Sequence, residues 1–127
     1  FINMKLFDED FFFYWEDVDM STRINKSKYK IFLNLKALAT HKIGTSAKFD
    51  IKPLYIRRVN FKFGEYLYQY KNKKLKIIKI LREPLTLLIS SILNLILLKP
   101  RKLFDKMFSL FGVFKFFMYV IRKKVFF

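Results

Sequence analysis

Carboxylates gather beside aromatic side chains near the start of this 127-residue chain. Six acidic residues flank a run of five aromatic residues: Asp8, Glu9, Asp10, Glu16, Asp17 and Asp19. A carboxylate held within hydrogen-bond reach of a hydroxyl group can act as a general base. Acidic residues at such a place also solvate loops and cap helices, and composition alone favours that simpler interpretation.

The spacing of these residues follows a known pattern. Phe7-Asp8-Glu9 comes first, aromatic residues run from Phe11 to Trp15, and Glu16-Asp17-Val18-Asp19 follows directly. Five later positions complete the pattern: Arg23, Ala37, His41 and the Gly44 and Ser46 of Gly44-x-Ser46. Residues 7–46 therefore resemble the family 2 glycosyltransferases, especially the rhamnosyltransferase-like members that build bacterial surface polysaccharides.

The resemblance implies an inverting, metal-dependent displacement. A sugar would pass from a nucleotide-sugar donor to a surface-polysaccharide or lipid-linked acceptor. The general base carries over to Asp17, with Glu16 beside it as the other member of the catalytic pair. His41 carries over as a ligand of a divalent metal ion, Mn²⁺ or Mg²⁺, which offsets the charge on the departing diphosphate.

Other residues are expected to contact the substrates. Aromatic faces commonly stack on sugars, so Trp15 and Tyr14, together with Asp19, are candidates for acceptor binding, although such aromatic residues are also typical of a core. Asp19 lies four residues before Arg23, a spacing that also predicts a helical ion pair. Arg57 and Arg58 could contact a donor phosphate or belong to a solvated basic face.

The resemblance also implies an α/β fold, here the C-terminal part of a GT-A (Rossmann-like) domain. Leu6 and Lys28 depart from the family pattern, which has Gly at both positions. In the family the nucleotide is bound by an N-terminal half with an Asp-x-Asp motif, and the acidic cluster here cannot replace that motif because it lies where the acceptor-side motif belongs. Since the chain begins with Phe1, we expect a C-terminal fragment that is inactive alone.

Charge is distributed unevenly along the chain. Residues 1–50 hold 8 basic and 7 acidic side chains, whereas residues 51–127 hold 18 and 3. A net charge of +15 in the second segment favours a polyanionic partner, namely nucleic acid, an anionic membrane or a phosphate-bearing substrate. The sequence contains no Cys, which excludes disulfides and thiolate metal sites.

Several elements are predicted around the motif residues. Acidic residues at the start and lysines at the end favour a helix over residues 16–28. Residues 29–35 and 37–41 are expected to be extended strands, and residues 44–46 a loop. Beyond Leu54 the pattern is helical, with an amphipathic, basic helix over residues 73–83 that Pro84 kinks or restarts.

The uncharged run from Pro84 to Leu98 has 15 residues, whereas a membrane span needs about 20. We therefore expect a re-entrant, interfacial or buried helix, closed by the basic residues 99–102 at a cytoplasmic membrane edge. Residues 103–127 mix Phe, Met and Tyr with Lys and Arg, which is typical of a helix lying in a headgroup layer.

These patterns divide the chain into residues 1–53, the end of a catalytic domain, and residues 54–127, a basic membrane-associated tail. We expect a peripheral or monotopic enzyme on the cytoplasmic face of the cell membrane, with an anionic membrane surface as a partner. A non-catalytic membrane-binding protein and a nucleic-acid-binding module remain alternatives. Nucleic acid is not expected as a partner, because the cations flank apolar runs and form no recognisable module.

Overall fold

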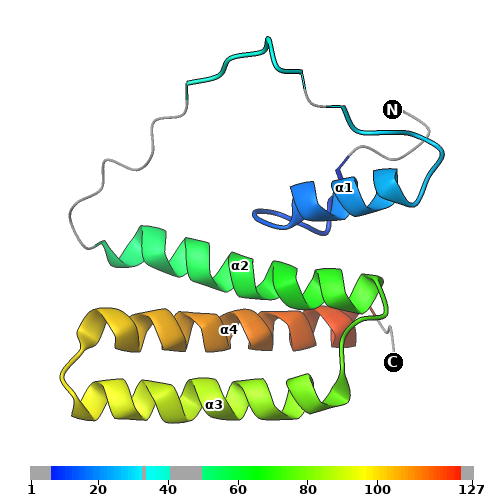
Figure 1. Cartoon of the computed structure of the whole chain (residues 1–127). Helices are drawn as coiled ribbons and strands as arrows, with labels where there is room; N and C mark the ends of the chain where they lie inside the picture. Colours follow the sequence, from blue (N-terminus) through cyan, green and yellow to red (C-terminus); the bar gives the residue numbers. More distant parts are fainter. Residues whose placement is uncertain (1–6, 33, 41–49, 124–127) are drawn as a thin grey trace.

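A computed structural model describes residues 7–32, 34–40 and 50–123 of the chain. These residues form four α-helices: α1 (Glu16–Asn25), α2 (Ile51–Lys71), α3 (Ile77–Ile96) and α4 (Pro100–Arg122). Helices α2, α3 and α4 run back and forth as a bundle in which α4 packs against both of the others. Helix α1 lies on the other side of α2 from α3 (Figure 1).

The predicted α/β fold is wrong for the described part of the chain, which is all-helical and contains no strand. Residues 29–32 and 34–40, where strands were expected, form an exposed connection with a single turn. Phe32 and Leu38 are 84% and 96% exposed. A strand needs a partner for its backbone groups and a surface for its apolar face, and the described residues provide neither.

Helix α1 begins where the sequence predicts, at Glu16, and ends at Asn25, three residues before the predicted end. Glu16, Asp17 and Asp19 occupy its first turn, where the positive end of the helix dipole favours acidic side chains. The Nε atom of Arg23 donates to Oδ2 of Asp19 at 2.7 Å, so the helical ion pair predicted from the spacing is confirmed.

Helix α2 starts with a side-chain cap, because Oδ1 of Asp50 accepts a hydrogen bond from the amide of Lys52 at 3.0 Å. The predicted domain boundary at Pro53 falls in the first turn of this helix, where proline is tolerated. Tyr66 and Leu67 of α2 are fully buried. They belong to the core cluster that α2 forms with α4.

The backbones of α2 and α4 approach closely at Gly112. A Cβ atom added there would lie 2.6 Å from the carbonyl oxygen of Val59 and 2.8 Å from the Cβ of Lys62. Only glycine fits this contact without displacing the backbone of α2. Phe116, one turn further along α4, is fully buried and lies 5.4 Å from Tyr66 between ring centroids.

Helix α4 is the central helix of the bundle and packs against both α2 and α3, while its predicted place in a headgroup layer stays a prediction. Its buried positions recur every three or four residues and lie on the bundle side: Phe108, Ser109, Gly112, Val113, Phe116 and Val120. Phe111, Phe114, Met118 and Ile121 form an exposed stripe on the same helix. The sequence predicted an amphipathic helix but not which of its faces would be buried in protein.

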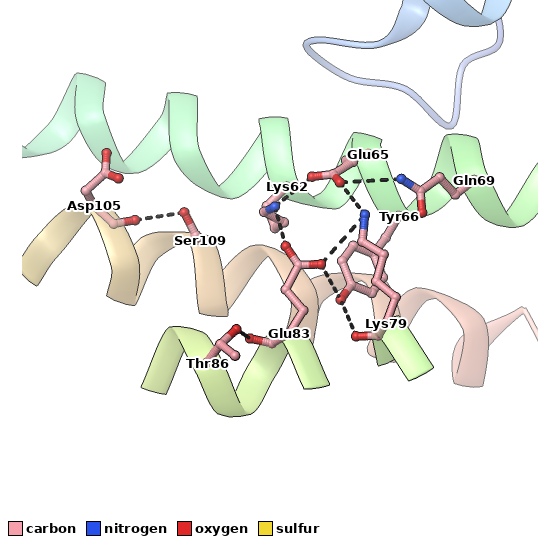
Figure 2. A network of polar contacts seen from close by, with 9 residues as sticks. All are labelled: Lys62, Glu65, Tyr66, Gln69, Lys79, Glu83, Thr86, Asp105 and Ser109. Atoms are coloured by element: carbon pink, nitrogen blue, oxygen red, sulfur yellow. Dashed lines mark hydrogen bonds and ion pairs between the residues drawn. The ribbon is translucent and has the colours of Figure 1, made fainter. Parts of the chain in front are cut away.

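Helix α3 runs through Pro84, where a kink or restart was expected. Charged side chains join it to α2, as Figure 2 shows: Lys62 contacts Glu83 at 2.7 Å and Glu65 at 2.6 Å, and Lys79 pairs with Glu65. The hydroxyl of Tyr66 donates to Oε2 of Glu83 at 3.0 Å. Burial alone would raise the pKa of Glu65, but its hydrogen bonds from Lys62 and Lys79 lower it.

Candidate functional site

A pocket of about 550 Å³ lies against α1 and the segment that follows it. Met20, Ser21 and Ile24 line it together with Asp17, and these four residues share one face of α1 at spacings of one to four. Aromatic and aliphatic side chains close its other sides: Phe7, Tyr29, Ile31 and Phe32. An apolar pocket with a few polar groups is the usual form of a small-molecule site.

Asp17, the predicted general base, lines this pocket. It lies in the first turn of α1, and its side chain is exposed to solvent. Its Oδ1 atom accepts a hydrogen bond from the amide of Val18 at 2.8 Å, which fixes one oxygen at the helix N-terminus. The carboxylate is therefore oriented by the backbone and remains accessible to a hydroxyl group in the pocket.

Two cationic residues, Arg23 and Lys30, line the same pocket. Arg23 holds Asp19 on α1, while Lys30 belongs to the exposed segment after the helix. The pocket thus combines one carboxylate, two cationic side chains and an apolar wall. A polar ligand with an apolar face and some negative charge fits this combination.

Glu16, the predicted second member of the catalytic pair, is partly buried. Its Oε2 atom is inaccessible to solvent and has no hydrogen-bond partner in the part of the chain that the structure describes. Glu16 does not line the pocket described above. The structure thus separates the two carboxylates, with Asp17 facing the pocket and Glu16 turned toward the protein.

Tyr14 and Trp15 lie against α2. Both adopt left-handed backbone angles, with φ of 69° and 73°. The ring centroid of Trp15 lies 5.7 Å from that of Phe61 and 5.3 Å from that of Tyr68. Gly64 makes the contact possible, since a Cβ there would lie 2.9 Å from both Trp15 Cδ1 and the Tyr14 carbonyl oxygen.

Asp19 is 4% exposed and paired with Arg23, so its carboxylate points into the protein. Thr22 shares a hydrogen bond of 2.8 Å with the hydroxyl of Tyr68, which joins α1 to α2. The three residues predicted to bind the acceptor, Tyr14, Trp15 and Asp19, therefore hold α1 and its preceding turn in place. None of the three lines the pocket.

The remaining predicted residues lie elsewhere. Arg57 is exposed on α2, and Arg58 forms an ion pair with Asp105 of α4. Neither residue lines the pocket beside α1. His41, the predicted metal ligand, lies outside the described residues. The residues that are described contain no group of three or more His, Cys, Asp or Glu side chains that could hold a metal ion.

Sequence reasoning missed the role of the first acidic residues, which attach the N-terminal turn to the helix ends. Lys71 contacts Asp10 at 2.7 Å and also pairs with Asp8, while the hydroxyl of Tyr119 donates to Asp10 at 2.7 Å. Burial alone would raise the pKa of Asp10, but hydrogen bonds from Lys71 and Tyr119 and the charge of Lys71 lower it to about 2.

Sequence reasoning also missed the apolar wall of the pocket. The helical spacing of Asp17, Met20 and Ile24 could have indicated a shared face, because residues three and four apart are neighbours on a helix. The contribution of Tyr29 to Phe32 could not be seen in the same way, because those residues were predicted to form a strand.

Comparisons of the chain with protein-family models, with curated proteins and with solved structures find no match. The functional argument therefore depends on the residues themselves and on their arrangement around the pocket.

Proposed function

We propose that this chain provides the acceptor side of an inverting glycosyltransferase, with Asp17 as the general base. One observation carries the proposal: the carboxylate that the motif singles out is the one that lines the apolar pocket beside α1. Exposure and a backbone hydrogen bond to Val18 leave that carboxylate accessible and oriented. Both properties are required of a general base that takes a proton from a bound hydroxyl group.

In the proposed reaction, an acceptor saccharide places a hydroxyl group beside Asp17. The carboxylate takes the proton as the acceptor oxygen forms a bond to the anomeric carbon of a nucleotide-sugar. The bond from that carbon to the diphosphate oxygen breaks on the opposite face, and the nucleoside diphosphate leaves with the electron pair. Attack and departure on opposite faces invert the anomeric centre.

The pocket wall has the chemistry to hold a saccharide. Tyr29 and Phe32 offer aromatic faces for the apolar side of a sugar ring, and Ser21 offers a hydroxyl group for its polar edge. Arg23 and Lys30 line the same space and favour negative charge there. These assignments support the acceptor side of the reaction and leave donor binding to residues outside the pocket.

A divalent metal ion, Mn²⁺ or Mg²⁺, belongs to this proposal as the ion that offsets charge on the leaving diphosphate. The described residues do not fit such an ion, since they include no group of three or more suitable ligands, and His41 lies outside them. The steps assigned to this chain are therefore the binding of the acceptor and the transfer of its proton.

The test is made in the native membranes, by introducing Asp17→Asn into the gene of the source cells. Transfer of radiolabel from UDP-glucose, UDP-galactose and dTDP-rhamnose into saccharide is then measured. We expect a loss of about 10²–10⁴-fold, the usual contribution of a general base. The matched control is Asp50→Asn, because Asn also caps helices well and Asp50 lies outside the pocket.

The control should keep transfer within about twofold of the unaltered protein, since Asp and Asn are comparable caps. Transfer that Asp17→Asn leaves intact contradicts the assignment of the base. An equal loss in both variants also contradicts it, because that result would reflect folding and not chemistry at Asp17.

A further inference from the structure

Helix α3 presents an apolar face that nothing in the described chain covers. Only Leu87 and Ser91 of its 20 residues are buried. The large apolar side chains on its outer surface are between 47% and 74% exposed: Ile77, Ile78, Leu81, Leu85, Leu88, Ile89, Ile92, Leu93, Leu95 and Ile96. Soluble proteins seldom expose an apolar surface this long, and such a surface usually marks an interaction site.

Cationic side chains lie at both ends of this face. Lys73, Lys74 and Lys76 precede α3, and Lys99, Arg101 and Lys102 follow it; all six are exposed. Within the face, Arg82 is the only charged residue that is exposed, because Lys79 and Glu83 join the ion-pair network with α2. A long apolar strip with cations at its ends matches a surface whose interior is hydrocarbon and whose headgroups are anionic.

The length of α3 decides whether the helix would cross a bilayer or lie along its surface. No helix among the described residues is long and apolar enough to cross a membrane. An amphipathic helix instead lies in the plane of the interface, with its apolar face about 5–10 Å into the headgroup boundary. The ion pairs to α2 keep the opposite side of α3 attached to the bundle.

We propose that α3 docks this protein in the plane of an anionic lipid bilayer, through its outer apolar face and the cations that flank it. In this orientation α3 is the helix of the bundle that contacts the membrane. Helix α1, which carries Asp17, lies on the other side of α2 from α3 (Figure 1) and so lies away from the lipid. This inference concerns the docking surface and holds whether or not Asp17 takes part in chemistry.

The experiment measures how the purified chain partitions onto vesicles of phosphatidylcholine and phosphatidylglycerol in equal parts. The test variant is Leu81→Glu with Leu88→Glu, two positions seven residues apart on the outer face of α3. The matched control is Leu35→Glu with Leu38→Glu, which adds the same charge at residues that are 83% and 96% exposed in the connection before α2. Circular dichroism and thermal unfolding establish that both variants keep the fold.

The α3 variant should bind about 100-fold more weakly than the unaltered chain, because it lacks two leucine side chains that the bilayer would bury. The control should bind within about threefold of it, since it changes only the overall charge. Pure phosphatidylcholine vesicles should bind the unaltered chain more weakly than the anionic ones. Equal losses in the two variants, or no loss in either, overturn the proposal.

Duplex DNA and RNA are measured in parallel, because the cations alone could retain nucleic acid. Strong, salt-sensitive nucleic-acid binding that the α3 variant keeps, together with no binding to vesicles, would assign the cations to nucleic acid and overturn the membrane proposal. Self-association of the unaltered chain that the α3 variant abolishes, again with no binding to vesicles, would assign the face to a second copy and also overturn it.

Discussion

Helices α2 and α3 have nearly the same length, 21 and 20 residues, but they use their apolar side chains in opposite ways. Helix α2 carries six charged residues and buries seven positions, including Tyr66 and Leu67. Helix α3 carries only three charged residues, Lys79, Arg82 and Glu83, and buries two positions. The more apolar of the two helices is therefore the one that contributes less to the core.

The comparison of α2 with α3 shows that a helix can be strongly apolar and still be little buried in the protein. Helix α2 is buried because α4 approaches it closely at Gly112 and because the turn of Tyr14 and Trp15 covers it at Gly64. Helix α3 contacts α4 on one side and leaves its other side open. An apolar face that residues 7–32, 34–40 and 50–123 do not cover is suited to a non-aqueous environment, which is the basis of the membrane proposal.

The largest expected effect compares the same substitution on the two helices. Leu67 of α2 is 0% exposed and Leu81 of α3 is 67% exposed. Leu67→Ala should lower the free energy of unfolding by about 2–5 kcal/mol, from lost burial and the cavity left behind. Leu81→Ala should change it by less than about 0.5 kcal/mol in water. Urea unfolding of both variants checks this, and similar values for the two would remove the contrast.

A smaller effect is expected where α4 meets α2. Gly112→Ala places a Cβ 2.6 Å from the Val59 carbonyl oxygen, so the helices must separate, at a cost of about 1–3 kcal/mol. Alanine otherwise stabilises a helix interior by about 1 kcal/mol relative to glycine. The sign of the change in thermal stability therefore decides the point: a more stable Gly112→Ala variant would show that the two backbones are not in contact.

The third prediction concerns the buried carboxylate that holds α1. Asp19→Asn should destabilise the protein by about 1–2 kcal/mol, because Arg23 loses a charged partner that is 2.7 Å away and almost fully buried. Asp17→Asn, two residues earlier on the exposed side, should stay within about 0.5 kcal/mol. Chemical denaturation measures the stability of both variants. Equal losses of stability would mean that the two carboxylates have similar surroundings, which would contradict the structure.

The smallest expected effect is acid sensitivity from Asp10. The folded protein lowers the pKa of this carboxyl to about 2 from its ordinary 3.8, so its contribution to stability is present above about pH 4. That contribution is lost as the pH falls from about 4 toward 2. Asp10→Asn should reduce stability at neutral pH by about 1 kcal/mol or less, since the site is partly exposed.

Unfolding measured from pH 6 to pH 2 checks the sign, because the gap between Asp10→Asn and the unaltered chain should close in acid. A gap that stays constant over this range would mean that the carboxylate of Asp10 is not the group that titrates.

The sequence predicted helices more reliably than it predicted which elements pack against one another. Acidic residues and spacing located the start of α1 and the Asp19–Arg23 pair, because both depend on positions within one helix. The expected strands at residues 29–35 and 37–41 depended on a sheet partner, which no local pattern in this chain reveals. The place of α4 between α2 and α3 depended in the same way on long-range packing at Gly112 and Phe116.

The candidate site shows the same difference between features that local sequence predicts and features that depend on long-range packing. Asp17 could be singled out from its spacing to other residues, and the structure places it in a pocket. Tyr14 and Trp15 were expected to face a sugar, yet their left-handed backbone turns them toward Phe61 and Gly64 of α2. A sequence pattern names the residue types at a site, but the direction of each side chain depends on elements distant in the sequence.

The single tryptophan gives the most direct test of the claim that α3 faces lipid while the pocket side faces water. Trp15 is the N-cap of α1, the helix that lies across α2 from α3 (Figure 1), and its ring packs against Phe61 and Tyr68 of α2. Emission is measured on anionic vesicles that contain brominated acyl chains, for the unaltered chain and for Leu88→Trp. We predict that bromine quenches the emission added by Leu88→Trp more strongly than that of Trp15, which shares a surface pocket with Lys76 and Lys79 at the start of α3. Quenching of Trp15 that equals or exceeds that of the added tryptophan would contradict this orientation.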